Sequence, residues 1–494
     1  MRKRLRFAQS NKNPIKYAVQ IKRSVNNLEK IEKFFHVKER GSTVKTEIMA
    51  GITTFMTMAY ILMVNAGMFG ELGEGYYNAV YIATAISAVI GTVLIGLLAN
   101  LPLAQASGMG LNAFFVYTVC FGMGFTYANA LVFVLLDGLI FLLLTVTGLR
   151  RMIFEAIPRT IRIAIPAGIG LFIAFLGLQN AGLIQANPAT CVSLISFNIL
   201  GENTWASMMP AVVAIAGVLL IAIMSKRNVK GAVLWGILGS TALYYILGFT
   251  IPGFYDGFVE NFAFAPFAAF GDFANLSFGK VFTEGFDFSA YLAGHSTADL
   301  VITFISTSLA FCMVDMFDTL GTLYGACARG GLLDENGDVP NMERAMLADA
   351  VATTTGAVCG TSTVTTFVES SAGVAEGGRT GLAAMATAVL FFIAMFFTSI
   401  AALIPSSATA AALIFVGILM MRGVREIDWD DPAVAVPSFL AICMMPFTYN
   451  ISYGIAFGVL GFIIVNALSG NAKKINVGTW IVGLLFVAMF VLTH

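Results

Sequence analysis

The sequence predicts an all-α integral membrane protein with about fourteen membrane-spanning segments. Of its 494 residues, 58% are hydrophobic and only 11% are charged, whereas soluble globular proteins carry a charge on roughly a quarter of their residues. So few charges cannot cover a water-soluble body of this size, which indicates a lipid bilayer as the solvent. The formal net charge is zero, so the charge balance gives no indication of a nucleic-acid partner.

Residues 1–44 are expected to form a basic tail on the cytoplasmic side. The chain begins MRKRLRF, and this basic cluster is not followed by the apolar run that a cleavable signal peptide requires. Residues 28–37 have the pattern of a short amphipathic helix, which would lie on the membrane surface.

Fifteen apolar segments follow, and they predict fourteen or fifteen spans, with the last segment left open as a span. A helix needs roughly 20 mostly apolar residues to cross a bilayer. They lie near 47–67, 78–99, 108–122, 127–148, 161–181, 207–225, 230–250, 299–326, 344–358, 364–375, 381–404, 406–421, 433–448, 451–469 and 476–493. Three segments (108–122, 344–358 and 364–375) are too short to cross as unbroken helices. Short pieces interrupted by glycine or serine, at corresponding places of two halves, indicate a transporter binding site.

Two of these pieces correspond to each other. QASGMGLNAFFVYTV (105–119) and GTSTVTTFVESSAGV (360–374) both open with small and hydroxyl residues and continue as a short apolar helix. The number of spans between them gives the two pieces opposite orientations, which predicts an inverted repeat.

The basic residues in the turns between spans place the amino terminus in the cytoplasm. All of them fall on the side of the amino terminus if the spans alternate, in agreement with the positive-inside rule. They are Arg150, Arg151, Arg159, Arg162, Lys226, Arg227, Lys230, Arg329, Arg344, Arg422, Arg425, Lys473 and Lys474. The long loop 251–297 is then external, and it carries five acidic residues against the single Lys280.

Five carboxylates interrupt the apolar spans. They are Asp137, Asp315, Asp318, Asp349 and Glu369. A charge at mid-membrane costs roughly 2.5–3.5 kcal/mol on insertion scales, so such residues are candidates for a function. Asp315 and Asp318 stand three residues apart and share one helix face, so both are expected to point into one polar cavity. The alternative is a pair at a helix end that the loop solvates.

Glu369 lies in GTSTVTTFVESSAGVAEGGRTG. The Thr/Ser run has strand character, and a strand that leads into a half-helix leaves backbone groups that are tolerated at membrane depth only around a cavity or ligand. Glu369 is therefore expected to accept ligand N–H groups or to carry a coupling proton; the alternative is a structural carboxyl paired with a hydroxyl. Glu376 and Arg379, in AEGGRTG, are expected to form a local ion pair.

Asn112 follows SGMGL in the first of the two pieces. Its amide both donates and accepts, which suits a planar heterocycle. Gly110 has two explanations, close helix packing or close approach of a ligand. Asp137 and Asp349 are expected to be structural or proton-relay partners rather than ligand contacts.

Motifs for other chemistry are absent from the sequence. There is no G-x-x-x-x-G-K-[ST] and no H-E-x-x-H, so neither ATP hydrolysis nor a zinc protease is indicated. No C-x-x-C pair supports a metal or haem site. The sequence thus predicts no cofactor and no metal, and a secondary, ion-driven transport mechanism is what remains.

ASGMGLNAFF, DMFDTLGTL, LADA, GTSTVTTFVESSAGVAEGGRTG and IPSSATAAALIFVG together resemble the azaguanine-type purine permeases of the nucleobase–ascorbate transporter superfamily. The resemblance runs from about Phe34 to the carboxyl terminus. It implies fourteen spans in two inverted seven-span repeats, with a strand plus a half-helix in spans three and ten. It also implies a core domain (45–149 and 298–404), a gate domain (150–250 and 405–494) that dimerises, and the outer loop 251–297.

The resemblance also implies a site. Asp315, Asp318 and Glu369 match the family's acidic substrate and proton residues, and Gly110 and Asn112 match its span-three site. The backbone around Phe367–Val368 and Ala106–Ser107 is a further candidate for substrate contacts. Asp137 and Asp349 fit the family pattern, so the proton-coupling candidates are Glu369, Asp318, Asp349 and Asp137.

The function implied by the resemblance is import of purine nucleobases (adenine, guanine or hypoxanthine) through the cell membrane by proton symport and an elevator-like motion. Which purine is preferred, and whether the cation is a proton or sodium, stay open. The alternatives are an anion carrier or channel on the same fold, which the acidic site disfavours because anion pathways use basic residues, and a membrane-embedded enzyme.

Overall fold

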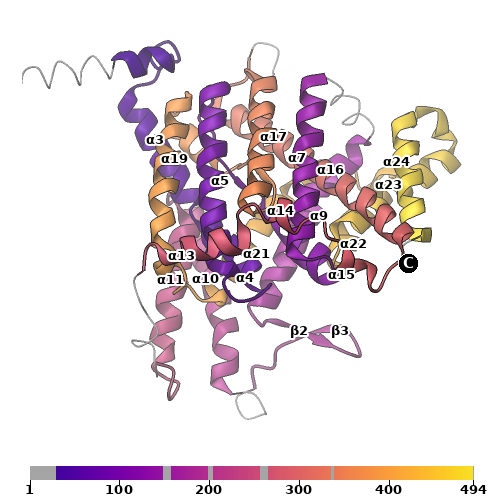
Figure 1. Cartoon of the computed structure of the whole chain (residues 1–494), viewed down its shortest axis with the longest axis horizontal. Coiled ribbons are helices and arrows are strands. Elements are labelled where there is room, and N and C mark those ends of the chain that lie inside the picture. The colour runs from indigo at the N-terminus through magenta and orange to yellow at the C-terminus, as the bar shows by residue number, and fades with distance from the viewer. Residues whose placement is uncertain (1–28, 148–156, 199–203, 256–264, 335–338, 493–494) are drawn as a thin grey trace, which may run out of the picture.

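The computed structural model describes residues 29–147, 157–198, 204–255, 265–334 and 339–492, and it consists mainly of long helices (Figure 1). Within these residues, nine helices are long and apolar enough to cross a membrane, and four shorter apolar helices accompany them. The prediction of an all-α membrane protein is confirmed. Much of the expected basic tail (1–28), the pair Arg150 and Arg151, and part of the outer loop (256–264) lie outside the described residues.

The helices follow the predicted spans closely. They are α3 (Val44–Met58), α4 (Tyr60–Gly70), α5 (Tyr76–Leu98), α7 (Tyr127–Thr147), α9 (Arg159–Asn180), α10 (Trp205–Lys226), α11 (Ala232–Gly248), α16 (Thr297–Gly330), α17 (Met342–Cys359), α19 (Gly381–Ala394), α20 (Thr398–Ala401), α21 (Ser406–Met420), α22 (Pro432–Thr448), α23 (Ile451–Asn466) and α24 (Val477–Leu492). The first span is divided at Ala59, between α3 and α4. Residues 29–34 form a short helix before it, within the predicted range 28–37.

Helices from the two halves of the chain alternate in space. Helix α19 contacts both α3 and α5, and α17 contacts both α5 and α7, as Figure 1 shows by the orange helices set among the indigo and purple ones. The two halves therefore build one shared body rather than two separate ones.

Helix α16 carries two of the intramembrane carboxylates. A capping box begins it, because the Ser296 hydroxyl accepts from the N–H of Asp299 (3.1 Å) while the Asp299 carboxylate accepts from the N–H of Ser296 (3.0 Å). Its 34 residues correspond to about 50 Å of helix, which exceeds the bilayer core of about 30 Å. Asp315 and Asp318 lie near the middle of this helix.

Two short strands meet at the centre of the molecule. Strand β1 (Gln105–Ser107) pairs antiparallel with β4 (Val364–Thr366), with Ala106 opposite Thr365, and all six residues are buried. Helix α6 (Met109–Ala113) follows β1 and continues as the π-type helix η1 (Phe114–Gly122), while α18 (Ser370–Ala375) follows β4. The predicted strand plus half-helix is present in both places.

Threonine hydroxyls form hydrogen bonds with the backbone groups at the outer edges of these strands. The Thr92 hydroxyl of α5 donates to the carbonyl of Gln105 and accepts from its N–H (3.1 and 3.0 Å). The Thr353 hydroxyl of α17 does the same with Val364 (3.1 and 3.2 Å). Backbone groups at membrane depth need such partners. A threonine that bonds both backbone groups of a strand residue thus occurs on the second span (α5) and on the ninth span (α17). Two halves related by an inverted repeat would produce this correspondence.

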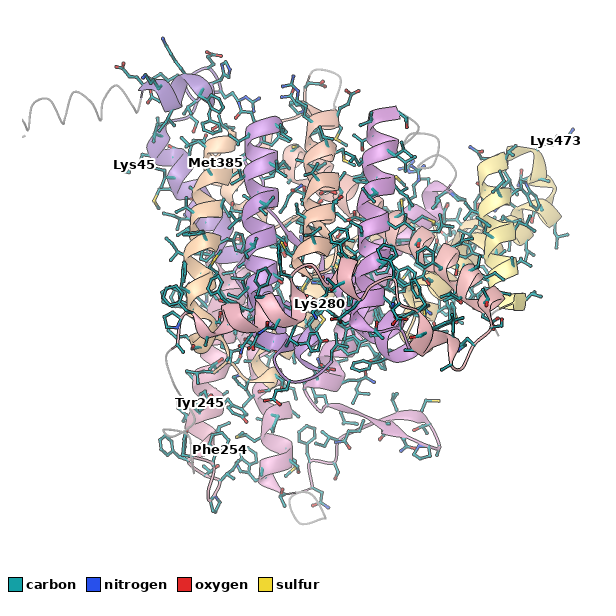
Figure 2. All side chains as sticks on the ribbon, in the orientation of Figure 1. Lys45, Tyr245, Phe254, Lys280, Met385 and Lys473 are labelled. Carbon is teal, nitrogen blue, oxygen red and sulfur yellow. The ribbon has the colours of Figure 1, made fainter. Side chains whose placement is uncertain are left out.

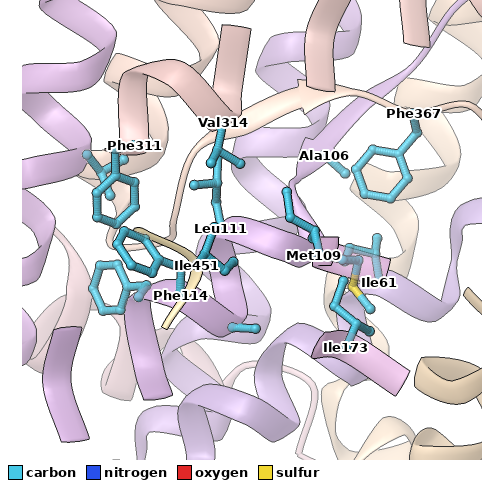
Figure 3. Packing of buried hydrophobic residues seen from close by; sticks show 14 of the residues in the cluster. Ile61, Ala106, Met109, Leu111, Phe114, Ile173, Phe311, Val314, Phe367 and Ile451 are labelled. Carbon is cyan, nitrogen blue, oxygen red and sulfur yellow. The ribbon is translucent and has the colours of Figure 1, made fainter. Parts of the chain in front are cut away.

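Apolar side chains fill the space around the strands. In Figure 3, Phe114 of η1 lies beside Phe311 of α16, with ring centroids 4.9 Å apart, and Met109 lies near Ile61 and Ile173. Close packing of this kind fixes the positions of the polar residues described below.

Helices α9 and α21 approach each other closely at two glycines, Gly170 and Gly417. A Cβ on Gly417 would lie 2.3 Å from the carbonyl oxygen of Gly170, and a Cβ on Gly170 would lie 2.6 Å from that of Gly417. Small residues at such a crossing let two membrane helices pack backbone against backbone.

Two regions differ from the expectation. A hairpin of β2 (Ile184–Asn187) and β3 (Cys191–Leu194) stands where no strand was predicted. The described part of the outer loop contains the short helices α13 (Ala268–Asp272), η2 (Phe273–Ser277), α14 (Lys280–Thr283) and α15 (Ser289–Leu292).

In Figure 2, Lys45 and Lys473 lie toward one end of the molecule and Tyr245 and Phe254 toward the other.

Candidate functional site

A cavity opens where the two half-helices meet the long helices. About 60 Å³ of it is accessible to the centre of a water-sized sphere. Its walls come from α4, the β1–α6 turn, α16, the β4–α18 turn and α21. The lining residues are Tyr60, Gly108, Met109, Gly110, Asp318, Thr322, Thr366, Phe367, Val368, Glu369, Val416 and Met420.

Glu369 lies at the start of α18, and Tyr60 holds it in place. The Tyr60 hydroxyl donates to Oε1 of Glu369 at 2.7 Å, and the Thr57 hydroxyl donates to the Glu369 carbonyl at 3.3 Å. Tyr60 is the first residue of α4, so the division of the first span at Ala59 positions this phenol. A carboxylate has about four acceptor positions, and Glu369 therefore keeps capacity for donors from a ligand.

Asp318 faces the same cavity from α16. One of its carboxylate oxygens, Oδ2, lies 3.7 Å from the place where a Cβ on Gly108 would stand. The absence of a side chain at Gly108 therefore leaves room between the Gly108 backbone and the Asp318 carboxylate. Among the described residues that line the cavity, Asp318 and Glu369 are the charged ones, and none is basic. The electrostatic character of this site is acidic.

The start of α6 adds hydrogen-bond donors. Its first intrahelical bond runs from the N–H of Asn112 to the carbonyl of Gly108 (2.9 Å), and no side chain caps the helix. The N–H groups of Met109 and Gly110 thus have no acceptor within the helix. A ligand in the cavity would meet carboxylate acceptors on one side and backbone donors on the other.

Five predicted residues line this cavity: Gly110, Asp318, Phe367, Val368 and Glu369. Three others lie elsewhere: Asp315, Asn112 and Ser107. Asp315 does not share the cavity with Asp318, contrary to the expectation from their spacing. It is fully buried beside α17, where the Thr353 hydroxyl lies 3.4 Å from its Oδ2. Residues three apart on a helix differ by about 60° in direction, and this difference is enough to turn Asp315 toward α17.

Asn112 and Ser107 bond to each other. The Ser107 hydroxyl donates to Oδ1 of Asn112 (2.7 Å), and Nδ2 of Asn112 donates to the Ser107 carbonyl (3.3 Å). Thr361 lies within 3.0 Å of the same Ser107 hydroxyl. The Asn112 amide thus holds the turn from β1 into α6.

Asp349 joins α17 to both neighbouring elements. Its Oδ1 accepts from Nε2 of Gln105 on β1 (3.0 Å), and its Oδ2 accepts from the hydroxyl of Thr319 on α16 (2.7 Å). Nε2 of Gln105 also lies 3.2 Å from the hydroxyl of Thr366 on β4. This arrangement places Asp349 behind the strand pair, one residue layer from the cavity.

Asp137 of α7 is fully buried. Within the described part of the chain, neither of its carboxylate oxygens has a hydrogen-bond partner. The described residues contain no group of three or more His, Cys, Asp or Glu side chains arranged to hold a metal ion.

The expected ion pair between Glu376 and Arg379 is wrong. The Glu376 carboxylate lies 2.5 Å from Nζ of Lys230, in the turn between α10 and α11. The Arg379 guanidinium instead donates to the carbonyls of Val374 and Gly378, both at 2.7 Å. The unsatisfied carbonyls at the end of a helix attract an arginine, and this attraction outweighs the local carboxylate.

Sequence reasoning missed several lining residues, among them Tyr60, Thr322, Thr366, Val416 and Met420. Tyr60 stands in the apolar run TMAYILM, which gives no local signal of a polar contact. Val416 and Met420 belong to α21, and the sequence does not say which span packs against the half-helices.

The chain has clear relatives among known proteins. A family model described as "Permease family" (Xan_ur_permease) matches residues 45–457. The chain is 37% identical to the adenine permease AdeP of Escherichia coli (strain K12) over 461 residues, which cover 93% of this chain and 96% of that one. It is 36% identical to the guanine/hypoxanthine permease PbuO of Bacillus subtilis (strain 168), with 93% of this chain and 100% of that one covered.

Solved structures with the same fold are more distant in sequence. The transmembrane domain of the cyanobacterial bicarbonate transporter BicA superposes with a TM-score of 0.55 at 15% identity, covering 84% of this chain and 97% of that chain. The overall structure of SLC26A9 gives a TM-score of 0.56 at 12% identity, covering 94% and 71%. At these identities the likeness concerns the fold alone.

Proposed function

Because this chain belongs to the Permease family, and is therefore a multi-pass membrane transporter, we propose that it carries purine nucleobases across the membrane together with a proton. The observation that carries the proposal is the acidic cavity, in which Tyr60 orients Glu369 (2.7 Å) opposite the backbone donors of α6. The names of the adenine and guanine/hypoxanthine permeases among its relatives support the choice of a purine.

The cavity suits the hydrogen-bond pattern of a purine. Ring N–H groups are donors, and they would bond to the Glu369 and Asp318 carboxylates. Ring nitrogens are acceptors, and they would face the N–H groups of Met109 and Gly110. The flat faces of the ring would lie against the apolar side chains of the wall, such as Phe367, which is almost completely buried.

An anion carrier is the weaker proposal for this chain. BicA is a bicarbonate transporter, but a shared fold does not fix the substrate. An anion in this cavity would meet two carboxylates and, among the described lining residues, no basic side chain, and that arrangement repels negative charge.

For proton coupling, we assign the primary role to Glu369 and Asp318, because both line the cavity proposed for the substrate. Asp349 is one layer behind them through Gln105 and Thr319, and it would act with Asp137 as a relay or a structural partner. Sodium is the alternative cation, and the dependence of uptake on each ion distinguishes the two.

The walls of the cavity suit an elevator-like motion. Residues 45–149 and 298–404, the proposed core, supply the carboxylates and half-helices, while Val416 and Met420 come from the proposed gate (150–250 and 405–494). A Cβ on Gly110 would lie 2.5 Å from Cγ2 of Ile169 on α9, so a small residue lets core and gate pass closely. In this proposal the gate domains of two copies form a homodimer with the amino termini in the cytoplasm.

The direct test is uptake of radiolabelled adenine, guanine and hypoxanthine by cells that lack their own purine permeases. We expect saturable uptake of at least one purine, its abolition by a protonophore, and no change when sodium is replaced by potassium. Competition by bicarbonate and chloride is the control, with no inhibition expected. Absence of purine uptake, with the protein found in the membrane, would overturn the proposal.

Replacing Tyr60 by phenylalanine is expected to raise the KM for purine uptake roughly tenfold, because a hydrogen bond to a charged group stabilises by about 1.5–3 kcal/mol. The change removes one oxygen and leaves the ring in place. Tyr81→Phe is a matched control, because its hydroxyl also makes one hydrogen bond (3.0 Å, to the Ala394 carbonyl) but lies outside the cavity lining. Equal KM values for the two variants would contradict the role given to Tyr60.

A further inference from the structure

A second cavity lies at the end of the molecule where the described chain begins, away from Glu369. Its space accessible to the centre of a water-sized sphere is about 360 Å³, which is larger than that of the cavity between the half-helices. The segment before α3, the end of α5 and the start of α17 enclose it. The lining residues are Phe34, Phe35, His36, Arg40, Gly96, Leu97, Leu98, Asn100, Asn341 and Arg344.

The charged side chains that line this cavity are basic within the described residues. They are Arg40 and Arg344, with His36 beside them, and none of the ten described lining residues is acidic. Among the described residues, the Glu39 carboxylate accepts from the His36 ring (2.8 Å). The Glu47 carboxylate, which interacts electrostatically with Arg40, accepts from the backbone N–H groups of Arg379 and Thr380 (2.9 and 3.2 Å).

Arg40 is held rigidly but incompletely satisfied. Its Nη1 donates to the carbonyls of Asn100 (2.8 Å) and Arg379 (3.1 Å), which fixes the plane of the guanidinium. Within the described residues its other N–H groups make no hydrogen bond to the protein. Burial lowers the pKa of Arg40, as expected for a cation that has lost water without gaining a full counter-charge.

The polar backbone around the cavity is also fixed. Nδ2 of Asn100 donates to the Phe35 carbonyl (3.0 Å), and its Oδ1 accepts from the N–H of Gly381 (2.8 Å). Nδ2 of Asn341 donates to the Ala99 carbonyl (3.1 Å). These bonds tie the segment before α3 to α5, α17 and α19, so the cavity is a preformed feature of the fold rather than a gap under a loose segment.

The rim is apolar on the exposed side. Of the lining residues, Phe34 is 63% exposed and Leu97 46%. Exposed apolar residues beside arginines are typical of surfaces at the membrane–water boundary, where phosphate groups are abundant. The fork of a guanidinium also matches the oxygens of a phosphate group better than those of a spherical anion.

We propose that this cavity is a phosphate-binding site in which Arg40 and Arg344 hold the phosphate oxygens, separate from the substrate cavity and independent of the substrate that the protein carries. Two sources have this chemistry: the headgroup of an anionic phospholipid, and a soluble phosphate compound. The apolar rim gives a lipid chain a surface to lie on, whereas a soluble compound would use the polar lining alone.

The test is thermal unfolding of the purified full-length protein in detergent, with four additions compared at equal ionic strength: phosphatidylglycerol, phosphatidylcholine, inorganic phosphate and AMP. Potassium chloride is the reference. We expect phosphatidylglycerol to raise the unfolding midpoint by about 3 °C or more over potassium chloride. A rise with phosphatidylglycerol alone identifies a lipid headgroup, and a rise with inorganic phosphate or AMP identifies a soluble phosphate compound. No rise with any phosphate compound overturns the proposal.

Arg344→Gln is the discriminating variant, because Arg344 is exposed and its loss leaves the fold intact. The shift caused by the phosphate compound is expected to fall at least by half. Arg425→Gln is the matched control, because it removes a basic residue outside the cavity lining, and it should leave the shift unchanged. An equal shift in wild type and Arg344→Gln would overturn the assignment. Arg40→Gln, which also breaks two backbone contacts, serves as a second variant whose shift should vanish.

Discussion

Replacing Glu369 by glutamine is expected to reduce the kcat/KM of purine uptake by at least about 100-fold, which corresponds to about 2.7 kcal/mol. The substitution keeps the size of the side chain and removes its charge. One of its terminal atoms becomes an NH₂ group, which cannot accept a hydrogen bond from a ring N–H. This donor would then face another donor, either the Tyr60 hydroxyl or a ligand N–H. A hydrogen bond to a charged group is worth about 1.5–3 kcal/mol, and the site of a coupling proton is lost as well.

The measurement is uptake normalised to the amount of protein in the membrane. Glu74→Gln is the control, since Glu74 is an exposed residue between α4 and α5 and does not line the cavity; its uptake should stay within roughly twofold of wild type. Unaltered uptake by Glu369→Gln, at normal expression, would remove Glu369 from both the substrate and the proton role.

Replacing Gly417 by alanine is expected to destabilise the protein by roughly 1–3 kcal/mol. The added Cβ would lie 2.3 Å from the carbonyl oxygen of Gly170 and 2.9 Å from the backbone N of Ala174. Both neighbours are backbone atoms of α9, so no side-chain rotation relieves the contact, and the two helices must move apart. The loss of close packing is costly in a membrane because van der Waals contact drives much of the helix association there.

The comparison is with Gly67→Ala in α4, where nothing lies within 4 Å of the added Cβ. Alanine favours a helix by about 1 kcal/mol over glycine, so this control should be neutral or slightly stabilising. Thermal stability in detergent, followed by size-exclusion chromatography after heating, measures both variants. Equal midpoints for Gly417→Ala and Gly67→Ala would contradict the importance of the α9–α21 contact.

The positions of the spans were predictable because twenty apolar residues leave few alternatives to a helix in lipid. The strand plus half-helix at 364–375 was predictable for a similar reason, since the Thr/Ser run is unsuited to a lipid-facing helix. The β2–β3 hairpin was missed because its two four-residue strands are largely exposed, so no alternation of buried and exposed residues marks them.

The site was predictable only in part. Asp318 and Glu369 stand out because carboxylates are rare in apolar spans, and both line the cavity. The same signal selected Asp315, but its carboxyl faces α17, where it accepts from the Thr353 hydroxyl. Charge alone does not give the direction of a side chain. Tyr60 and Val416 carry no charge to mark them, and their place in the wall depends on how distant spans pack.

The pairing of β1 with β4 also bears on how the protein is made. At 5–20 residues per second, Val364 leaves the ribosome on the order of ten seconds or more after Ser107. Until then the inner edge of β1 lies at membrane depth without its partner, and each such unpaired backbone group costs several kcal/mol in hydrocarbon. The centre of the protein is therefore completed late, after most of the spans have been inserted. A polypeptide that stops before Val364 lacks the strand that pairs with β1.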